Sequence, residues 1–316
     1  MSYRIDPRLP LTGEVRRILA EEIGKALVHL DAAHDRPEQA LHKCRRRLKK
    51  VRALLRLVRP GDETFCSTEN QCYREVAALL AEPREATALV ETIDRLAKNF
   101  PEQSAGGGLD AVRDTLVARQ HQLHGGVGLG AAIAAATAAC EDGISRIDTL
   151  VLPDQPEQQA ADVLAEGARI TLRRARKALD KAGSRGDADD FHDLRKAAKT
   201  HGMHLSLLGR LWPTPIKARR KAVDELGEKL GELHDVFVLR TLLEAHDRPL
   251  GSPQETRLLS KLLKRSEKSL KKTCLAAAAD LFGDRPRRST KKLARKARTD
   301  LAAAPHEDAS APGAAA

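Results

Sequence analysis

The sequence has 316 residues, 41% of them hydrophobic but only 3% aromatic, and its formal net charge is +11. Because Leu, Ala, Glu, Lys and Arg are abundant, the composition indicates an all-α fold of one large domain or two ordinary ones. Five cysteines without a CxxC spacing indicate neither a disulfide framework nor a zinc site. No apolar run approaches the roughly 20 residues of a transmembrane helix, and no secretory signal opens the chain, so we expect a cytoplasmic protein without membrane contact.

Proline, glycine and a 3.6-residue hydrophobic rhythm divide the chain into helices. The expected helices cover about residues 12–30, 37–59, 68–100, 109–124, 131–150, 157–182, 190–211, 216–246, 253–282 and 286–300. Thr12 is the expected cap of the first helix, and Asp189 or Asp190 that of the helix near 190. Pro83 is expected to kink or break the long third helix. The helices are assigned to a single domain over 10–300, followed by a disordered tail at 301–316.

The helix expected at 37–59 carries an apolar stripe and, about 100° around its wheel, a basic stripe. The apolar stripe consists of Leu41, Cys44, Leu48, Val51, Leu55 and Val58. The basic stripe consists of His42, Arg45, Lys49, Arg52 and Arg56. Residues 42–59 hold nine Lys or Arg and no acidic residue. A basic stripe beside a buried seam can line a groove between helices, which is typical of an anion site.

The same pattern recurs 150 residues later, where His192 matches His42. The second apolar stripe is Phe191, Leu194, Ala198, His201, Leu205 and Leu208, and the second basic stripe is His192, Arg195 and Lys199. At the same offset LLAEPREA (79–86) aligns with KLGELHDV (229–236). Two motifs that share one offset predict an internal duplication, with halves at about 10–130 and 131–300.

Arg and Lys side chains suit phosphate oxygens, and successive members of a helical stripe lie about one turn, roughly 5.4 Å, apart. Such a row can contact an extended chain of phosphates, and a bound anion would relieve the repulsion among the cations. A solvated basic face is the alternative for either helix alone, which the duplication makes less attractive. His42 and His192 could donate to an anion or pair with a carboxylate. His201 lies in the apolar seam, where we expect an interior histidine.

Two other functions remain open. His192-Asp193 and His234-Asp235 resemble the HD pairs with which helical phosphohydrolases hold a metal, although the basic neighbours of His192 are a poor setting for a dication. Residues 285–298 form a basic cluster that could contact nucleic acid, although so few aromatic residues leave little to stack on bases. No Walker loop, GxGxxG motif or credible nucleophile appears. We therefore expect no enzymatic activity, no cofactor and no metal.

The motifs HDLRKAAK (192–199), LGELHDV (230–236), HKCRRRLKKVR (42–52) and LLAEPREA (79–86) together resemble the CHAD family, named for its conserved histidines and α-helical fold. The resemblance covers about residues 10–285. It implies two pseudo-symmetric helical bundles that enclose a basic central cavity for inorganic polyphosphate, and association with polyphosphate granules. Without an accompanying triphosphatase domain, we expect a stand-alone polyphosphate-binding protein.

The resemblance also implies site residues. The family's histidines fall on His42 and His192, and its basic positions fall on Arg45, Lys49, Arg52, Arg195, Lys196 and Lys199. The helical wheel adds Arg46 and Arg56. Where the family's second-half pattern usually has Arg-Tyr, this chain has Gly202-Met203. We therefore expect the first-half stripe to contribute more strongly to binding than the second.

Overall fold

The computed structural model describes residues 3–33, 35–124, 127–154, 157–211, 216–245 and 250–302. Over these residues the chain forms helices and no strand, which confirms the predicted all-α class. The helices are α1 (Leu11–Asp31), α2 (Pro37–Val58), α3 (Glu63–Leu79), α4 (Glu82–Asn99), α5 (Pro101–Ser104), α6 (Asp110–His124), α7 (Val127–Arg146), the 3-10 turn η1 (Ile147–Thr149), α8 (Glu157–Ser184), α9 (Ala188–Leu207), α10 (Ile216–Glu244), α11 (Pro253–Phe282) and α12 (Pro286–Ala302). Of the tail expected at 301–316, the first two residues end α12 and the rest lies outside the described residues.

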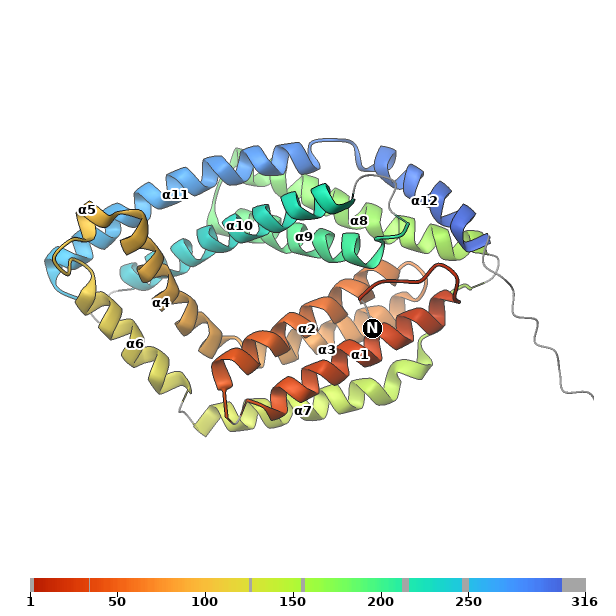
Figure 1. Cartoon of the computed structure of the whole chain (residues 1–316), viewed down its shortest axis with the longest axis horizontal. Coiled ribbons are helices and arrows are strands. Elements are labelled where there is room, and N and C mark those ends of the chain that lie inside the picture. The colour runs from red at the N-terminus through yellow and green to blue at the C-terminus, as the bar shows by residue number, and fades with distance from the viewer. Residues whose placement is uncertain are drawn as a thin grey trace, which may run out of the picture.

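Helices α1, α2, α3 and α7 pack together in the lower half of Figure 1, and α8 to α12 pack together in the upper half. The two groups touch where α2 meets α8 and α9. Helix α4 leaves the lower group and packs against α10, while α6 packs against α4 and reaches α11. The cavity described below lies between the groups and is bounded by α2, α4, α9 and α10.

The buried apolar residues form two separate cores. The main core joins both groups of helices through leucine- and alanine-rich faces, among them Leu48 and Leu55 of α2 and Leu194 of α9. The smaller core contains Leu89, Val90, Ile93, Leu96, Leu109, Val112, Leu116, Val236, Leu239, Leu250, Leu259, Leu262 and Leu263. These residues come from α4, α6, the distal part of α10 and the start of α11, together with Leu109 and Leu250 just before α6 and α11. The smaller core therefore closes one end of the molecule.

Helices α2 and α8 cross unusually closely at Gly167. A methyl group added at Gly167 would lie only 1.8 Å from the carbonyl oxygen of Leu57, so a residue larger than glycine cannot fit without moving a backbone. This contact fixes the position of the C-terminal half of α2 against the second group of helices. Because α2 is one continuous helix, the same contact also sets where its N-terminal half faces the cavity.

The break in the long third helix was predicted, but it occurs before the proline. Helix α3 ends at Leu79 and α4 begins at Glu82, which places Pro83 in the first turn of the new helix. A proline is tolerated there because the first N–H groups of a helix have no intrahelical partner. Proline therefore marks the start of α4, as it marks the starts of α2 and α11.

Two predicted helix caps are wrong. Thr12 does not cap α1, because the cap position is Pro10 and the Thr12 hydroxyl bonds the Leu152 carbonyl at 3.2 Å. Helix α9 is capped by Asp187, whose carboxylate accepts the backbone N–H of Asp190 at 2.9 Å. The short turn before α9 is possible because Gly186 adopts a φ of 72°. At α9 a neighbouring aspartate takes the cap, whereas the cap position of α1 is a proline without a side-chain cap hydrogen bond.

Helices from both sides of the expected division near residue 130 pack together in space. Helix α7, placed by sequence in the second half, packs against α1 and α3. Helices α4 and α6, placed in the first half, share the smaller core with α10 and α11. The predicted duplication concerns the origin of the sequence and stays a prediction. Over the described residues, no helix is both long and apolar enough to cross a bilayer.

A charged cavity between helices α2, α9 and α10

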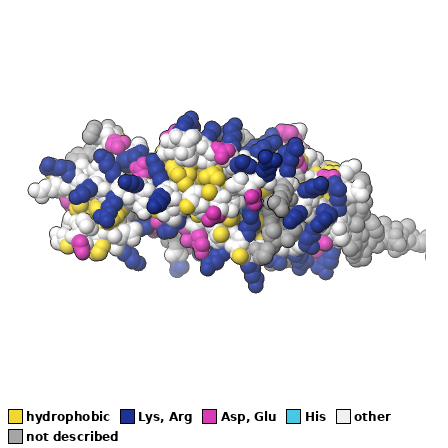
Figure 2. Space-filling view, turned by 90° about the horizontal axis from the view of Figure 1, so that it is seen from above, with side chains coloured by type: hydrophobic (Ala, Val, Ile, Leu, Met, Phe, Trp, Pro, Cys, Tyr) yellow, Lys and Arg dark blue, Asp and Glu magenta, His cyan; other side chains and the backbone are white. Residues whose placement is uncertain are grey.

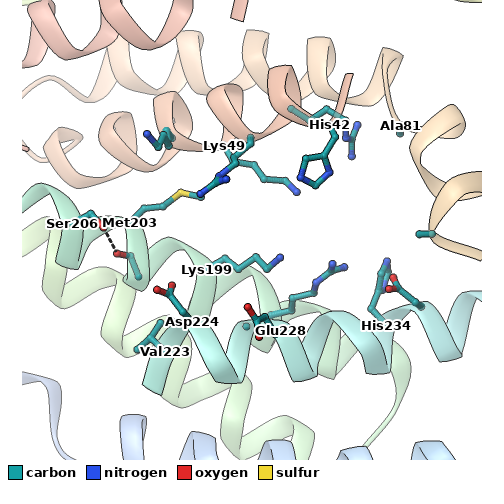
Figure 3. Close-up of a pocket in the computed structure, with 18 of the residues that line it drawn as sticks. His42, Lys49, Ala81, Lys199, Met203, Ser206, Val223, Asp224, Glu228 and His234 are labelled. Atoms are coloured by element: carbon teal, nitrogen blue, oxygen red, sulfur yellow. Dashed lines mark hydrogen bonds between the residues drawn. The ribbon is translucent and has the colours of Figure 1, made fainter. Parts of the chain in front are cut away.

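A cavity of about 810 Å³ lies between α2 on one side and α9 and α10 on the other, with α4 at one end. Eight Lys or Arg and four Asp or Glu line it. Figure 3 shows Lys49 and His42 projecting from one wall, with Lys199 and His234 on the opposite wall. We call this space the charged cavity.

Helix α2 presents His42, Arg46 and Lys49 to the charged cavity, and all three are exposed. Their position follows from the apolar stripe, because Leu41 and Leu48 are buried in the main core and hold the adjacent face of α2 inward. Arg45 also reaches the cavity and donates a hydrogen bond to the Ala77 carbonyl of α3. The α2 wall is therefore basic over about two helical turns.

Several other cations of α2 are paired with acidic residues of neighbouring helices. Glu22 of α1 is buried and accepts from Arg47 at 3.1 Å and from Lys50 at 3.2 Å. Arg59, which directly follows α2, likewise forms an ion pair with Glu63 of α3. The acid-free composition of residues 42–59 thus overstates the charge that α2 offers to a ligand, because acidic residues elsewhere neutralise part of it.

Helix α9 contributes only two cations to the charged cavity, Arg195 and Lys199. The next positions along the same face, Gly202, Met203 and Ser206, line the cavity without charge. Gly202 and Met203 stand where the expected pattern has Arg-Tyr. The positive charge that this arginine would carry is therefore missing from the cavity wall itself. Beyond Ser206 the α9 wall meets the N-terminal segment, from which Arg4 also lines the cavity.

Helix α10 makes the opposite wall partly acidic. Asp224, Glu228 and Asp235 line the charged cavity from α10, and Glu85 does so from α4. Asp224 lies 3.9 Å from Arg220 of its own helix, and Asp235 lies 3.6 Å from Arg95. The cavity is therefore polarised, with cations on α2 and mixed charges where α9 meets α10.

Lys199 lies in the most crowded part of this mixed wall. Burial and the nearby guanidinium of Arg195 lower the pKa of Lys199 to about 8, although the carboxylates of Asp235 and Glu228 act in the opposite direction. A bound anion would favour the charged ammonium and raise this pKa again. The charge of Lys199 near pH 8 therefore depends on what occupies the cavity.

Two histidines stack at the edge of the charged cavity. The rings of His192 and His234 are 4.8 Å apart and inclined by 28°. Burial, followed by the charge of Arg195, lowers the pKa of His234 to about 4, and burial together with Lys196 and Arg195 lowers that of His192. Both rings are therefore neutral at pH 7 in the absence of a ligand, and His234 rather than His192 faces the cavity.

The structure brings six of the ten predicted site residues into the charged cavity: His42, Arg45, Arg46, Lys49, Arg195 and Lys199. Arg52 lies against α3, where its Nε atom is 3.4 Å from the Asn70 side-chain oxygen. Arg56 and Lys196 line a different pocket, and His192 reaches the cavity only through its stacking on His234.

Sequence reasoning missed several residues of the charged cavity, including Arg4, Lys50, Arg220 and His234. Lys50 lies within the basic motif, but it falls on the face toward Glu22 and Tyr3 as well as the cavity. In the sequence repeat His234 aligns with Arg84, and this match of a histidine with a basic residue was the signal that could have indicated a role in the site. No sequence signal indicates Arg4, because only the fold brings the N-terminal segment to the cavity.

Two further histidines of α9 are interior. His201 is buried as predicted, with Arg219 donating to its ring at 3.4 Å, and burial keeps its pKa well below the usual value. His204 is also buried, and its Nε2 donates to the Ala53 carbonyl at 2.9 Å, which closes α9 against α2. Among the described residues, no group of three His, Cys, Asp or Glu side chains is placed to hold a metal ion.

The model of the CHAD domain family matches residues 17–244. Among solved structures, the protein PptA from Streptomyces chartreusis is similar with a TM-score of 0.62 and 17% identity, over 87% of this chain and 100% of that one. The CHAD domain from the plant Ricinus communis is similar with a TM-score of 0.51 and 19% identity, over 96% of this chain and 95% of that one. No curated protein matches the sequence significantly.

Proposed function

The chain belongs to the CHAD domain family, and from this premise we propose that it binds inorganic polyphosphate in the charged cavity. The observation that carries the proposal is that cations face one another across one cavity from two helices. Lys49 projects from α2 and Lys199 from α9 in Figure 3, and Arg46 of α2 and Arg195 of α9 line the same cavity. A chain of phosphates between these walls can be contacted from both sides, which a single basic helix on a surface cannot do.

The spacing of the cations also suits a polymer of phosphates. His42, Arg46 and Lys49 follow one another at about one helical turn, roughly 5.4 Å, along α2. Arginine offers a planar fork of donors and lysine a mobile point charge, and both recognise phosphate oxygens without needing a particular base or sugar. The acidic residues of α10 restrict the favourable path to the side of the cavity nearer α2. A linear polyanion can follow that path.

We propose that the role is binding without catalysis. The histidines of the two HD pairs, His192 and His234, stack on each other and are neutral. Arg195, Lys196 and Lys199 lie beside them, which is an unfavourable setting for a divalent cation. Incubation with polyphosphate and a series of divalent metals is expected to release no phosphate. Release that disappears in His192→Ala would overturn this part of the proposal.

The main experiment measures affinity for polyphosphate against chain length and salt. We expect affinity to rise with chain length until the cavity is filled, and to fall linearly in a plot of log K against log salt concentration as counterions are released. Single-stranded DNA of equal charge serves as the competitor. If it binds as tightly as polyphosphate, selective recognition in the charged cavity is wrong.

A nucleic-acid interface on α12 is the second candidate function. Lys291, Lys292 and Arg295 are exposed on that helix, and Figure 2 shows Lys and Arg side chains gathered on the face seen from above. Replacing these three residues by alanine tests the candidate, because none lines the charged cavity. We expect the triple variant to bind polyphosphate with little change in affinity. Loss of polyphosphate binding in this variant would instead favour the α12 interface. In cells, the proposal predicts co-localisation with polyphosphate granules in the cytoplasm.

A further inference from the structure

A second pocket of about 330 Å³ lies on the other side of α9, between α8, α9 and the C-terminal half of α2. Its cations are Arg56, Arg174, Lys177, Lys181 and Lys196. Asp193 is the one acidic residue among its lining residues. The floor consists of small or hydroxyl side chains, with Thr171, Ala178, Ala197 and Thr200 buried beneath the charges. We call this space the α8–α9 pocket.

The α8–α9 pocket is separate from the charged cavity, because the two share no lining residue. Two different faces of α9 form the two sites: Arg195 and Lys199 face the charged cavity, whereas Lys196 and Thr200 face the α8–α9 pocket. The Thr200–Arg56 contact and the neighbouring His204–Ala53 contact both join α9 to α2.

Most of the positive charge in the α8–α9 pocket is not compensated by acidic residues. Lys196 pairs with Asp193 at 3.1 Å, which accounts for the one carboxylate. No described carboxylate lies within ion-pair distance of Arg174 or Lys177, which both project from α8. Two cations of α2, by contrast, have such a partner, because Glu22 of α1 pairs with Arg47 and Lys50. A pocket with several cations and one carboxylate lacks a counter-charge, which an anion would supply.

Arg56 provides a fixed donor at the base of the pocket. One terminal nitrogen, Nη1, donates to the Thr200 hydroxyl at 3.2 Å, and this hydroxyl in turn donates to the Lys196 carbonyl at 2.8 Å. That arrangement orients the guanidinium and leaves further N–H groups of its five-donor fork for a ligand. Burial, followed by the nearby charge of Arg174, lowers the pKa of Arg56.

We propose that the α8–α9 pocket is a second anion site, which takes a short phosphate-bearing anion such as pyrophosphate or tripolyphosphate. Its volume lies near the lower end of the roughly 300–1,000 Å³ typical of ligand pockets, which suits a small anion better than a folded polymer. Arg56 holds the anion from below, and Arg174 and Lys177 close over it from α8. The site does not depend on polyphosphate binding in the charged cavity.

Calorimetric titration with pyrophosphate and with tripolyphosphate tests the proposal. The main variant is Arg174→Ala with Lys177→Ala, two exposed positions at which loss of the fold is not expected. The matched control is Arg173→Ala with Arg176→Ala, which removes the same charge from the same helix at positions outside the pocket. Circular dichroism and thermal unfolding verify that both variants fold.

We expect the main variant to weaken binding of the short anion at least tenfold, by loss of two charge-assisted contacts, and the control to change it less than about twofold. Arg46→Ala with Lys49→Ala, in the charged cavity, is expected to leave this binding in place. Equal weakening by the main variant and the control would show general surface attraction and overturn the proposal. Loss of all short-anion binding in the charged-cavity variant would overturn it as well, without affecting the proposed function.

Discussion

Helices α2 and α9 form facing walls of the charged cavity, but they deliver their charge differently. Helix α2 carries more basic residues than α9, yet its Arg47 and Lys50 pair with Glu22 of α1 behind the wall. Helix α9 carries fewer, and Arg195 and Lys199 stand beside carboxylates of α10 that line the same side of the cavity. The cations of α2 are thus neutralised in part by α1 behind the wall, and those of α9 in part by α10 beside them. The comparison shows that the location of the acidic partners decides how strongly the cations of each wall attract a bound anion.

Removing two cations from the α2 wall should have the largest effect. We expect Arg46→Ala with Lys49→Ala to weaken polyphosphate binding about 100-fold, because two hydrogen bonds to a charged ligand contribute roughly 3 kcal/mol in total. Fluorescence anisotropy with a labelled chain measures the change. Lys43→Ala with Arg59→Ala removes two charges from the same motif outside the cavity, and an equal loss in that control would contradict the role of the wall.

The same experiment on the α9 wall should give a smaller effect. We expect Arg195→Ala with Lys199→Ala to weaken binding about thirtyfold, because the carboxylates of Glu228 and Asp235 already offset part of their attraction. Lys196→Ala is the control, since Lys196 lines the α8–α9 pocket and not the charged cavity. A loss larger than that of the α2 variant would reverse the comparison.

The pH dependence of binding sharpens the comparison further. In the ligand-free protein Lys199 is charged below its pKa of about 8 and neutral above it. Bound polyphosphate favours the charged form, so binding above that pH requires uptake of a proton. From this group we expect constant affinity below pH 8 and a loss of roughly tenfold by about pH 9. In Lys199→Arg, whose guanidinium stays charged, the loss should disappear; an unchanged profile would contradict the assignment.

The smallest effect is expected from adding a cation to the α9 wall. Met203 lines the cavity and has an unbranched side chain that lysine can replace at similar length. We expect Met203→Lys to tighten polyphosphate binding about threefold, which corresponds to well under 1 kcal/mol and is typical of a partly screened charge. Titration at two salt concentrations checks this, because the gain should shrink at the higher one. Weaker binding at both would contradict it.

The helices could largely be predicted because local signals define them. Pro37 and Pro253 lie in first turns, and the hydrophobic rhythm of α2 sets its buried face. The exact ends were less predictable: Thr12 bonds Leu152, 140 residues away, instead of capping its own helix. Such a choice depends on tertiary neighbours that no local pattern contains.

The candidate site could be predicted only where a whole face of one helix lines the same cavity. The wheel places His42, Arg45 and Lys49 together, and all three line the charged cavity. It also places Arg52 and Arg56 on the same stripe, but α3 covers the first and α9 separates the second from the cavity. A helical wheel gives the direction of a side chain, whereas the neighbour that it meets depends on how the helices cross. The roles of these residues in binding stay predictions.

The smaller core has a consequence for how the charged cavity opens. Because α4 and α6 pack in their own cluster with α10 and α11, we expect that they unfold together while the main core stays intact. Ala81, Glu85 and Leu89 of this region form one end of the cavity. Sub-global opening of α4 would therefore admit a long chain from the side rather than by threading its end. Amide hydrogens of α4 should then exchange faster than those of α2, and slow down when the cavity is filled.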